Sequence, residues 1–156
     1  MTSHSSQTES LTSATAGGLV HMSECTVLAG SVLAAGQARR FMTRVLCAHH
    51  AQAAHSAVTL AASELVTQAV LGGHGPVTVT LTCHVTAVTV AVSYPTDEAR
   101  YDTRLRLADE VAAMIIEGIS RASGRDVVDG QQRMWCTIPT GFVPVTKPPE
   151  QRREVR

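Results

Sequence analysis

The clearest pattern of hydrophobic and polar positions lies at residues 55–71, where apolar residues recur at helical spacing opposite a polar ridge. Two glycines at 72 and 73, then a Gly-Pro pair, follow this stretch and end it, as these residues do just past a helix. The pattern predicts an amphipathic helix over about 55–71. A shorter amphipathic helix is expected over about 38–46, where apolar residues alternate in pairs with arginines.

The spacing at which apolar positions repeat changes from 3.6 residues to 2 at residues 77–83, and it is again 2 at 88–93. In both stretches apolar residues alternate with Thr, Ala or Ser. This alternation predicts a β-hairpin with one buried face and one threonine-lined face. Strands are also expected at 25–30 and 133–139, with a loop over 94–106 and a helix over about 107–122. The order β-α-α-β-β-α-β predicts an α/β fold: a two-layer sandwich whose mixed, mostly antiparallel sheet carries helices on one face.

The two ends of the chain differ in composition from its middle. Nine of the first sixteen residues are Ser or Thr, and residues 147–156 are charged and start at a Pro-Pro break. Segments of this kind bury too little apolar surface to offset the entropy lost on ordering. We therefore expect a disordered tail over 1–21, one folded domain over 22–146 and a second tail over 147–156.

Charge and aromatic content exclude some classes of function. The chain has 13 basic and 13 acidic residues, a net charge of +0 and only five aromatic residues. This balance argues against a protein that binds nucleic acid or a membrane surface through charge or base stacking. No apolar stretch is long enough to span a membrane, and no positive leader precedes Arg39, so we expect a cytoplasmic protein.

The cysteines and histidines do not form a recognisable ligand motif. The four cysteines are widely spaced and include no Cys-x-x-Cys pair, so we expect buried, reduced thiols. His49, His50 and His55 lie close in sequence, but no Cys or carboxylate at suitable spacing accompanies them. We therefore expect no metal site.

The segment Ser63–Val70, with the sequence SELVTQAV, lies on the predicted long helix just before the hairpin. It resembles the motif S-E-L-V-T-N-A-V in the GHKL-type (histidine kinase-like) ATPase domain of actinobacterial anti-sigma factor serine kinases, and the resemblance covers about residues 24–140. Ala38–Phe41 is similar to the first helix of that family. The resemblance implies a Bergerat-like ATPase fold and regulation of transcription through a protein partner, either a sigma factor or an anti-sigma antagonist.

Three positions where the family contacts a nucleotide carry other residues here. Glu64 occupies the place of the general base, but Gln68 replaces the Asn that holds Mg²⁺, and Mg²⁺ tolerates little change in ligand position. Tyr94 replaces the Asp that accepts the adenine amino group. The glycine-rich phosphate loop is replaced by residues 108–114, which contain no Gly and include Asp109 and Glu110, whose charges repel phosphate.

These changes lead to a hypothesis of a degenerate family member, a pseudokinase that binds proteins and has no cofactor. The alternative is an active serine kinase that uses Mg·ATP, with Glu64 as general base. A third hypothesis is that the altered cleft holds another small ligand. The simpler, purely structural interpretation is that Glu64 and Gln68 lie on a solvated helix face and that Tyr94 is a partly buried loop residue.

The surface expected to contact a partner is the first helix. In the family, this helix and the neighbouring sheet edge mediate partner binding and dimerisation, which implies that a homodimer is compatible with this chain. Arg39, Arg40 and Arg44 are therefore candidate partner-binding residues, although exposed helix charges are the simpler interpretation. The charged run over 97–106 is expected to be a solvated loop, or else a second partner contact.

Overall fold

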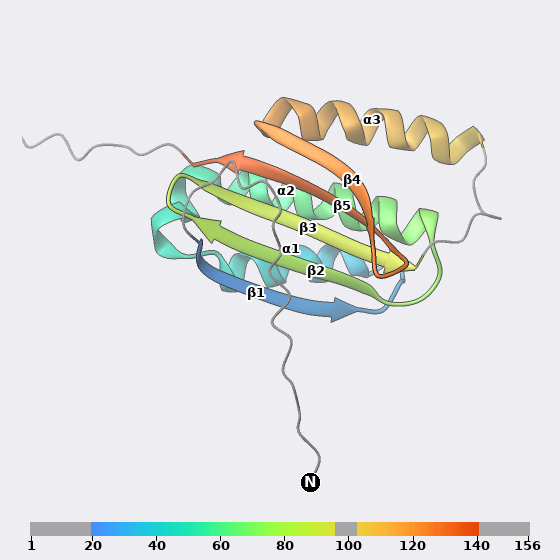
Figure 1. Ribbon diagram of the computed structural model, residues 1–156, viewed down its shortest axis with the longest axis horizontal. Helices are drawn as coiled ribbons and strands as arrows, with labels where there is room; N and C mark the ends of the chain where they lie inside the picture. The colour runs from blue at the N-terminus through green and yellow to red at the C-terminus, as the bar shows by residue number, and fades with distance from the viewer. Residues whose placement is uncertain (1–19, 96–102, 141–156) are drawn as a thin grey trace, which may run out of the picture.

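The computed structural model describes residues 20–95 and 103–140, which form three helices and a five-stranded sheet (Figure 1). The order of strands across the sheet is β1-β2-β3-β5-β4, and each described pair is antiparallel. The predicted α/β two-layer sandwich is therefore confirmed, with a sheet that is antiparallel throughout its described pairs. The strands are β1 Val20–Leu28, β2 Val77–His84, β3 Ala87–Pro95, β4 Ala122–Val128 and β5 Gln131–Pro139.

The helices α1 (Ala34–Val45) and α2 (Ala48–Gly72) cover one face of the sheet, behind it in the view of Figure 1. The third helix, α3 (Thr103–Ile119), packs against α2 and lies beside β4 at one edge of the sheet. No helix in the described part of the chain is both long and apolar enough to cross a membrane. The predicted tails fall outside the described residues, except for Val20 and His21, which begin β1.

The alternating hairpin residues sort onto the two faces of the sheet as expected. In β2, Val77, Val79, Leu81 and Cys83 are buried against the helices, while the intervening threonines lie on the opposite face. Each fully buried Val or Leu contributes about 1.5–3 kcal/mol through removal of apolar surface from water. The aliphatic core therefore fixes the register of the sheet, since a slip of one residue would turn these side chains to the open face.

The structure corrects the predicted order of elements by adding a strand. Residues 122–128, at the end of the expected third helix, form the edge strand β4 instead, and α3 ends at Ile119. Small and polar residues make up much of β4, so composition gave little sign of it. The dipeptide Asp129-Gly130 is the signal that was missed, because both residues have positive φ (52° and 74°), as a two-residue type I′ hairpin turn requires.

Several other boundaries differ from prediction. α1 begins at Ala34 and not near 38, and the expected loop 94–106 is shorter, because β3 continues to Pro95 and α3 begins at Thr103; its residues 96–102 lie outside the described part. α2 begins at Ala48, well before the expected start near 55, and Cys47 is its N-cap residue. β1 begins at Val20 and not at Cys25, because it pairs with β2 along nearly its whole length, from Val20 opposite His84 to Leu28 opposite Val77. Pairing with a long neighbouring strand thus extends an element that its own composition marks only weakly.

Candidate functional site at the α2–α3 contact

Gln68 connects α2 and α3, the two helices that carry the candidate site. It lies on the side of α2 that faces α3, and only 7% of its surface is exposed. Its Nε2 donates a hydrogen bond to the backbone oxygen of Ala108 in α3, at 3.3 Å. The side-chain amide that was expected near a Mg²⁺ position therefore binds the protein itself. The alternative of a solvated Gln68 does not fit this burial.

An ion pair reinforces this contact from the sheet. The Arg125 guanidinium of β4 lies 2.9 Å from the carboxylate of Asp109 in α3. Part of the pair is exposed, so its contribution is expected to be below about 1 kcal/mol. The pair joins α3 to β4, because Asp109 belongs to the helix and Arg125 to the strand.

Tyr94 lies at the end of β3, buried against the C-terminal end of α2. Any side chain at Gly73 would meet the Tyr94 ring at 2.8 Å and the oxygen of Pro95 at 2.3 Å, so the close approach depends on glycine. Burial raises the pKa of the Tyr94 hydroxyl, while the charges of Arg125 and Asp109 act on it in opposite directions. Tyr94 therefore presents a neutral hydroxyl where the family has an anionic Asp.

Little space remains between α2, α3 and the β4–β5 edge of the sheet. Among the described residues, the cavity there measures about 100 Å³. This volume is smaller than the about 300–1,000 Å³ of pockets that usually hold drug-sized ligands. The principal side chains around the cavity are those of Leu65, Gln68, Ile116, Met134 and Trp135.

Glu64 lies one turn before Gln68 on α2 and is half-buried. Its side chain does not line the cavity. The structure thus brings Gln68, Tyr94 and Asp109 together at one end of the α2–α3 contact, and leaves the Glu64 carboxylate one turn away from them. No step of chemistry follows from this arrangement by itself.

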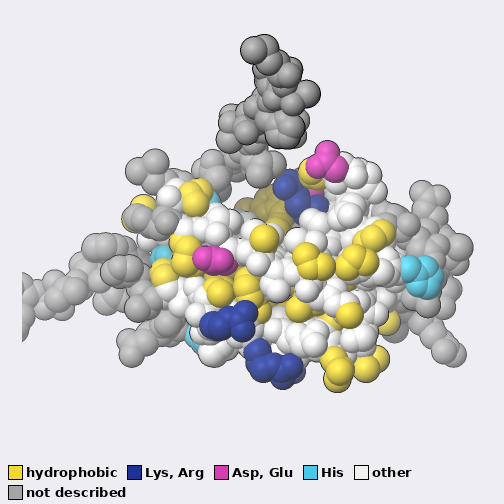
Figure 2. Space-filling model, turned by 90° about the horizontal axis from the view of Figure 1, so that it is seen from below, with side chains coloured by type: hydrophobic (Ala, Val, Ile, Leu, Met, Phe, Trp, Pro, Cys, Tyr) yellow, Lys and Arg dark blue, Asp and Glu magenta, His cyan; other side chains and the backbone are white. Residues whose placement is uncertain are grey.

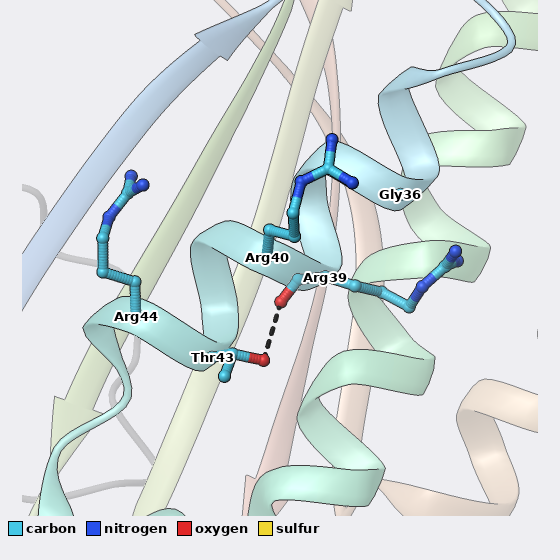
Figure 3. Close-up of a pocket in the computed structure, with 5 residues that line it drawn as sticks. All are labelled: Gly36, Arg39, Arg40, Thr43 and Arg44. Atoms are coloured by element: carbon cyan, nitrogen blue, oxygen red, sulfur yellow. Dashed lines mark hydrogen bonds between the residues drawn. The ribbon is translucent and has the colours of Figure 1, made fainter.

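The three candidate partner-binding arginines of α1 point in different directions (Figure 3). Arg39 points toward α2, where it donates a 2.9 Å hydrogen bond to Ser63 Oγ. Arg44 lies over the Phe41 ring at 5.8 Å, and Arg40 extends into solvent. An open hollow of about 360 Å³ runs along this part of the helix. Arg39 therefore has a hydrogen-bond partner within the protein, and all three arginines are exposed.

Exposed apolar residues precede the helix that carries these arginines. Val32 and Leu33, just before α1, are 95% and 66% exposed. Figure 2 shows one face of the molecule, over which apolar side chains are spread with basic side chains among them. We call Val32, Leu33, Arg40 and Arg44 the α1 surface.

A cluster that the sequence analysis missed lies at the other end of α2. Cys47, His50 and Cys83 offer ligand atoms within 4.8 Å of one another. His50 is buried and its Nε2 lies 2.8 Å from the backbone oxygen of His84. The Cys-x-x-His spacing of Cys47 and His50 was visible in the sequence, but only the fold places Cys83 beside them. His55 lies apart and is hydrogen-bonded to Thr43.

The four cysteines are free, but they are not all buried as expected. Cys25 is exposed on β1 and Cys47 is half-buried. Burial raises the pKa of Cys83 to about 11 and that of Cys136 to about 12, so both remain protonated thiols at neutral pH. The expectation for Cys25 was wrong because β1 is an edge strand with an open face.

A comparison with protein-family models finds no match to this chain, and a comparison with curated proteins finds none either. The functional interpretation therefore depends on the residues themselves. They form three distinct features: the α2–α3 contact around Gln68, the α1 surface, and the cluster of Cys47, His50 and Cys83.

Proposed function

We propose that this chain is a cytoplasmic regulatory protein, a degenerate member of the anti-sigma factor serine kinase family that acts by binding a protein partner. In this proposal it binds Mg·ATP weakly or not at all. The observation that carries the proposal is the 3.3 Å hydrogen bond from Gln68 to Ala108 above a cavity of only about 100 Å³. Both features support the proposal, because side chains of the protein occupy much of the region between α2 and α3 in which the resemblance would put a nucleotide.

The charges around this contact support the same conclusion. Asp109 and Glu110 lie near the end of α3 that would face the phosphates, and Asp109 is paired with Arg125. A polyphosphate there would have to separate an ion pair and then lie beside two carboxylates. Tyr94 supplies no negative charge for the adenine amino group. Each change weakens nucleotide binding independently of the others.

The α1 surface supports a role in protein binding. It combines exposed apolar side chains with two accessible arginines, and protein interfaces are enriched in this combination. The partner proposed is a sigma factor or an anti-sigma antagonist with an acidic patch that faces Arg40 and Arg44. Electrostatic complementarity of this kind mainly increases the association rate and the specificity.

The test is calorimetric titration of the full chain with each purified sigma factor and antagonist protein of its source genome. The variant Arg40→Gln/Arg44→Gln removes two positive charges without touching the Arg39–Ser63 bond. The control Val127→Glu/Gln131→Glu changes the net charge equally at exposed positions on the β4–β5 hairpin. We expect the Arg40→Gln/Arg44→Gln variant to bind a partner at least about tenfold more weakly, a loss of about 1.4 kcal/mol in binding free energy. The control should leave the affinity unchanged. Equal affinities for wild type and both variants would contradict the α1 docking proposal.

The competing function is an active kinase, which the half-buried Glu64 carboxylate, one turn from Gln68 on α2, favours. This alternative predicts ATP-dependent transfer of phosphate to a serine of an antagonist protein. Transfer by the wild type that is lost in Glu64→Ala would establish the kinase and refute the pseudokinase. Absence of transfer by the wild type is the result that the proposal expects.

A further inference from the structure

The cluster of Cys47, His50 and Cys83 lies at the opposite end of α2 from Gln68. Cys47 is the N-cap residue of α2, His50 lies one turn later, and Cys83 lies on β2 with its side chain toward the helices. Three kinds of position thus contribute: a helix cap, a helix turn and a neighbouring strand. Their ligand atoms come within 4.8 Å of one another.

His50 is held in a tautomer suited to metal binding. Its Nε2 lies 2.8 Å from the backbone oxygen of His84, inside the protein. A carbonyl oxygen only accepts hydrogen bonds, so Nε2 carries the hydrogen and Nδ1 carries the lone pair. Metal-binding histidines usually donate their second ring N–H to a carbonyl or carboxylate in this way.

The sulfur atoms of Cys47 and Cys83, together with the His50 ring, form a ligand set that prefers a particular class of metal ion. The Cys47 and Cys83 thiols are close enough to interact by hydrogen bonding. Two thiolates and one imidazole suit Zn²⁺, whereas Mg²⁺ and Ca²⁺ prefer oxygen ligands.

We propose that Cys47, His50 and Cys83 bind one thiophilic divalent cation, with Zn²⁺ as the reference ion and His50 coordinating through Nδ1. Solvent takes the fourth position, since Cys47 is half-buried and opens the cluster to the surface. Tetrahedral Zn²⁺ with bonds of about 2.3 Å to sulfur brings two sulfurs to about 3.8 Å apart. The three side chains therefore close by at most about 1 Å, and the two thiol protons pass to the solvent.

Binding would join the start of α2 to β2 and so fix the connection that follows α1. This proposal does not depend on the pseudokinase proposal, because the cluster and the α2–α3 contact lie at opposite ends of α2. Either can fail without the other.

The test uses the full chain, reduced and freed of metal, titrated with Zn²⁺ against a chromogenic chelator. Co²⁺ is added separately to detect thiolate coordination by its charge-transfer absorption. We expect one ion per chain with a dissociation constant of about 10⁻⁷ M or tighter. Cys47→Ser, His50→Gln and Cys83→Ser should each weaken binding by at least about tenfold.

The controls are Cys25→Ser and Cys136→Ser, which should leave one ion per chain. Cys136 matches Cys83 because both are fully buried strand cysteines in the core. If Cys83→Ser does not fold, Cys47→Ser still decides the outcome, since Ser is a favoured N-cap residue. Absence of Zn²⁺ binding by the reduced wild type, or equal binding by Cys47→Ser, would overturn the proposal. A Cys47–Cys83 disulfide in a protein that takes up no Zn²⁺ once reduced would also overturn it.

Discussion

Replacement of Gln68 by Ala tests whether this side chain holds α3 against α2. The substitution removes the hydrogen bond from Nε2 to the Ala108 oxygen, which is worth about 1 kcal/mol for a neutral pair. It also removes a buried methylene, which is worth about 0.8 kcal/mol. The Ala108 oxygen keeps its partner within the helix, so no buried group is left without one. We therefore expect a loss of about 2 kcal/mol in the free energy of unfolding.

The assay is urea unfolding followed by circular dichroism, with thermal unfolding as a second measure. For a folded part of this size, about 2 kcal/mol corresponds to a fall in Tm of about 6–12 °C. Hydrogen exchange should also accelerate in α3 more than in β2 and β3, because the lost bond joins α3 to α2 and involves neither strand. The control is Gln131→Ala, an exposed glutamine on β5, which should change stability by less than about 0.5 kcal/mol.

Equal stability of Gln68→Ala and wild type would refute the anchoring role of Gln68. A loss of stability with uniform exchange over the whole sheet would refute the claim that α3 is the element it holds. Gln68→Asn gives a second check, because its amide is one methylene shorter. We expect it to lose the bond to Ala108 and part of the stability.

Three further predictions test local features of the structure. Gly73→Ala should lower the free energy of unfolding by at least about 2 kcal/mol, because the added Cβ would lie 2.3 Å from a backbone oxygen of β3. Gly118→Ala, whose Cβ would meet no atom within 4 Å, should raise it by about 0.5–1 kcal/mol, and equal effects of the two changes in urea unfolding would contradict this. Arg133 lowers the pKa of Asp126, so this pair stabilises the protein above about pH 4, and its contribution falls as pH drops through the folded pKa. The difference in unfolding free energy between wild type and Asp126→Asn, at most about 1 kcal/mol for this partly exposed pair, should therefore narrow from pH 6 to pH 3 in urea unfolding, and a constant difference would be inconsistent with it. Cys25 should react with a thiol reagent in the folded, metal-free protein, while the fully buried Cys83 and Cys136 should react only in denaturant. Mass spectrometry of the labelled peptides measures this, and rapid labelling of all three cysteines in the folded protein would contradict their burial.

The sequence was most informative where one pattern dominated. Strict alternation over 77–83 and 88–93 predicted the central hairpin, and the apolar stripe over 55–71 predicted most of α2, because burial on one face follows directly from periodicity. β4 was missed because an edge strand needs little hydrophobicity and is held by pairing with β5. Its turn at Asp129-Gly130 was the one local signal for it.

The candidate site was predicted only in part. The motif drew attention to Glu64 and Gln68, and spacing along the helix placed them on neighbouring turns. The bond from Gln68 to Ala108 joins residues far apart in the chain, and no local pattern encodes such a contact. The same holds for Cys83, which reaches Cys47 and His50 only through the packing of β2 against α2.

The most direct test of the central claim is calorimetric titration of the purified full chain with ATP, with and without Mg²⁺. We predict no measurable heat of binding up to millimolar nucleotide, because in our proposal the α2–α3 contact occupies the nucleotide position and Asp109 would repel the phosphates. Micromolar binding that requires Mg²⁺ would contradict the account and would make the kinase the better description of this protein.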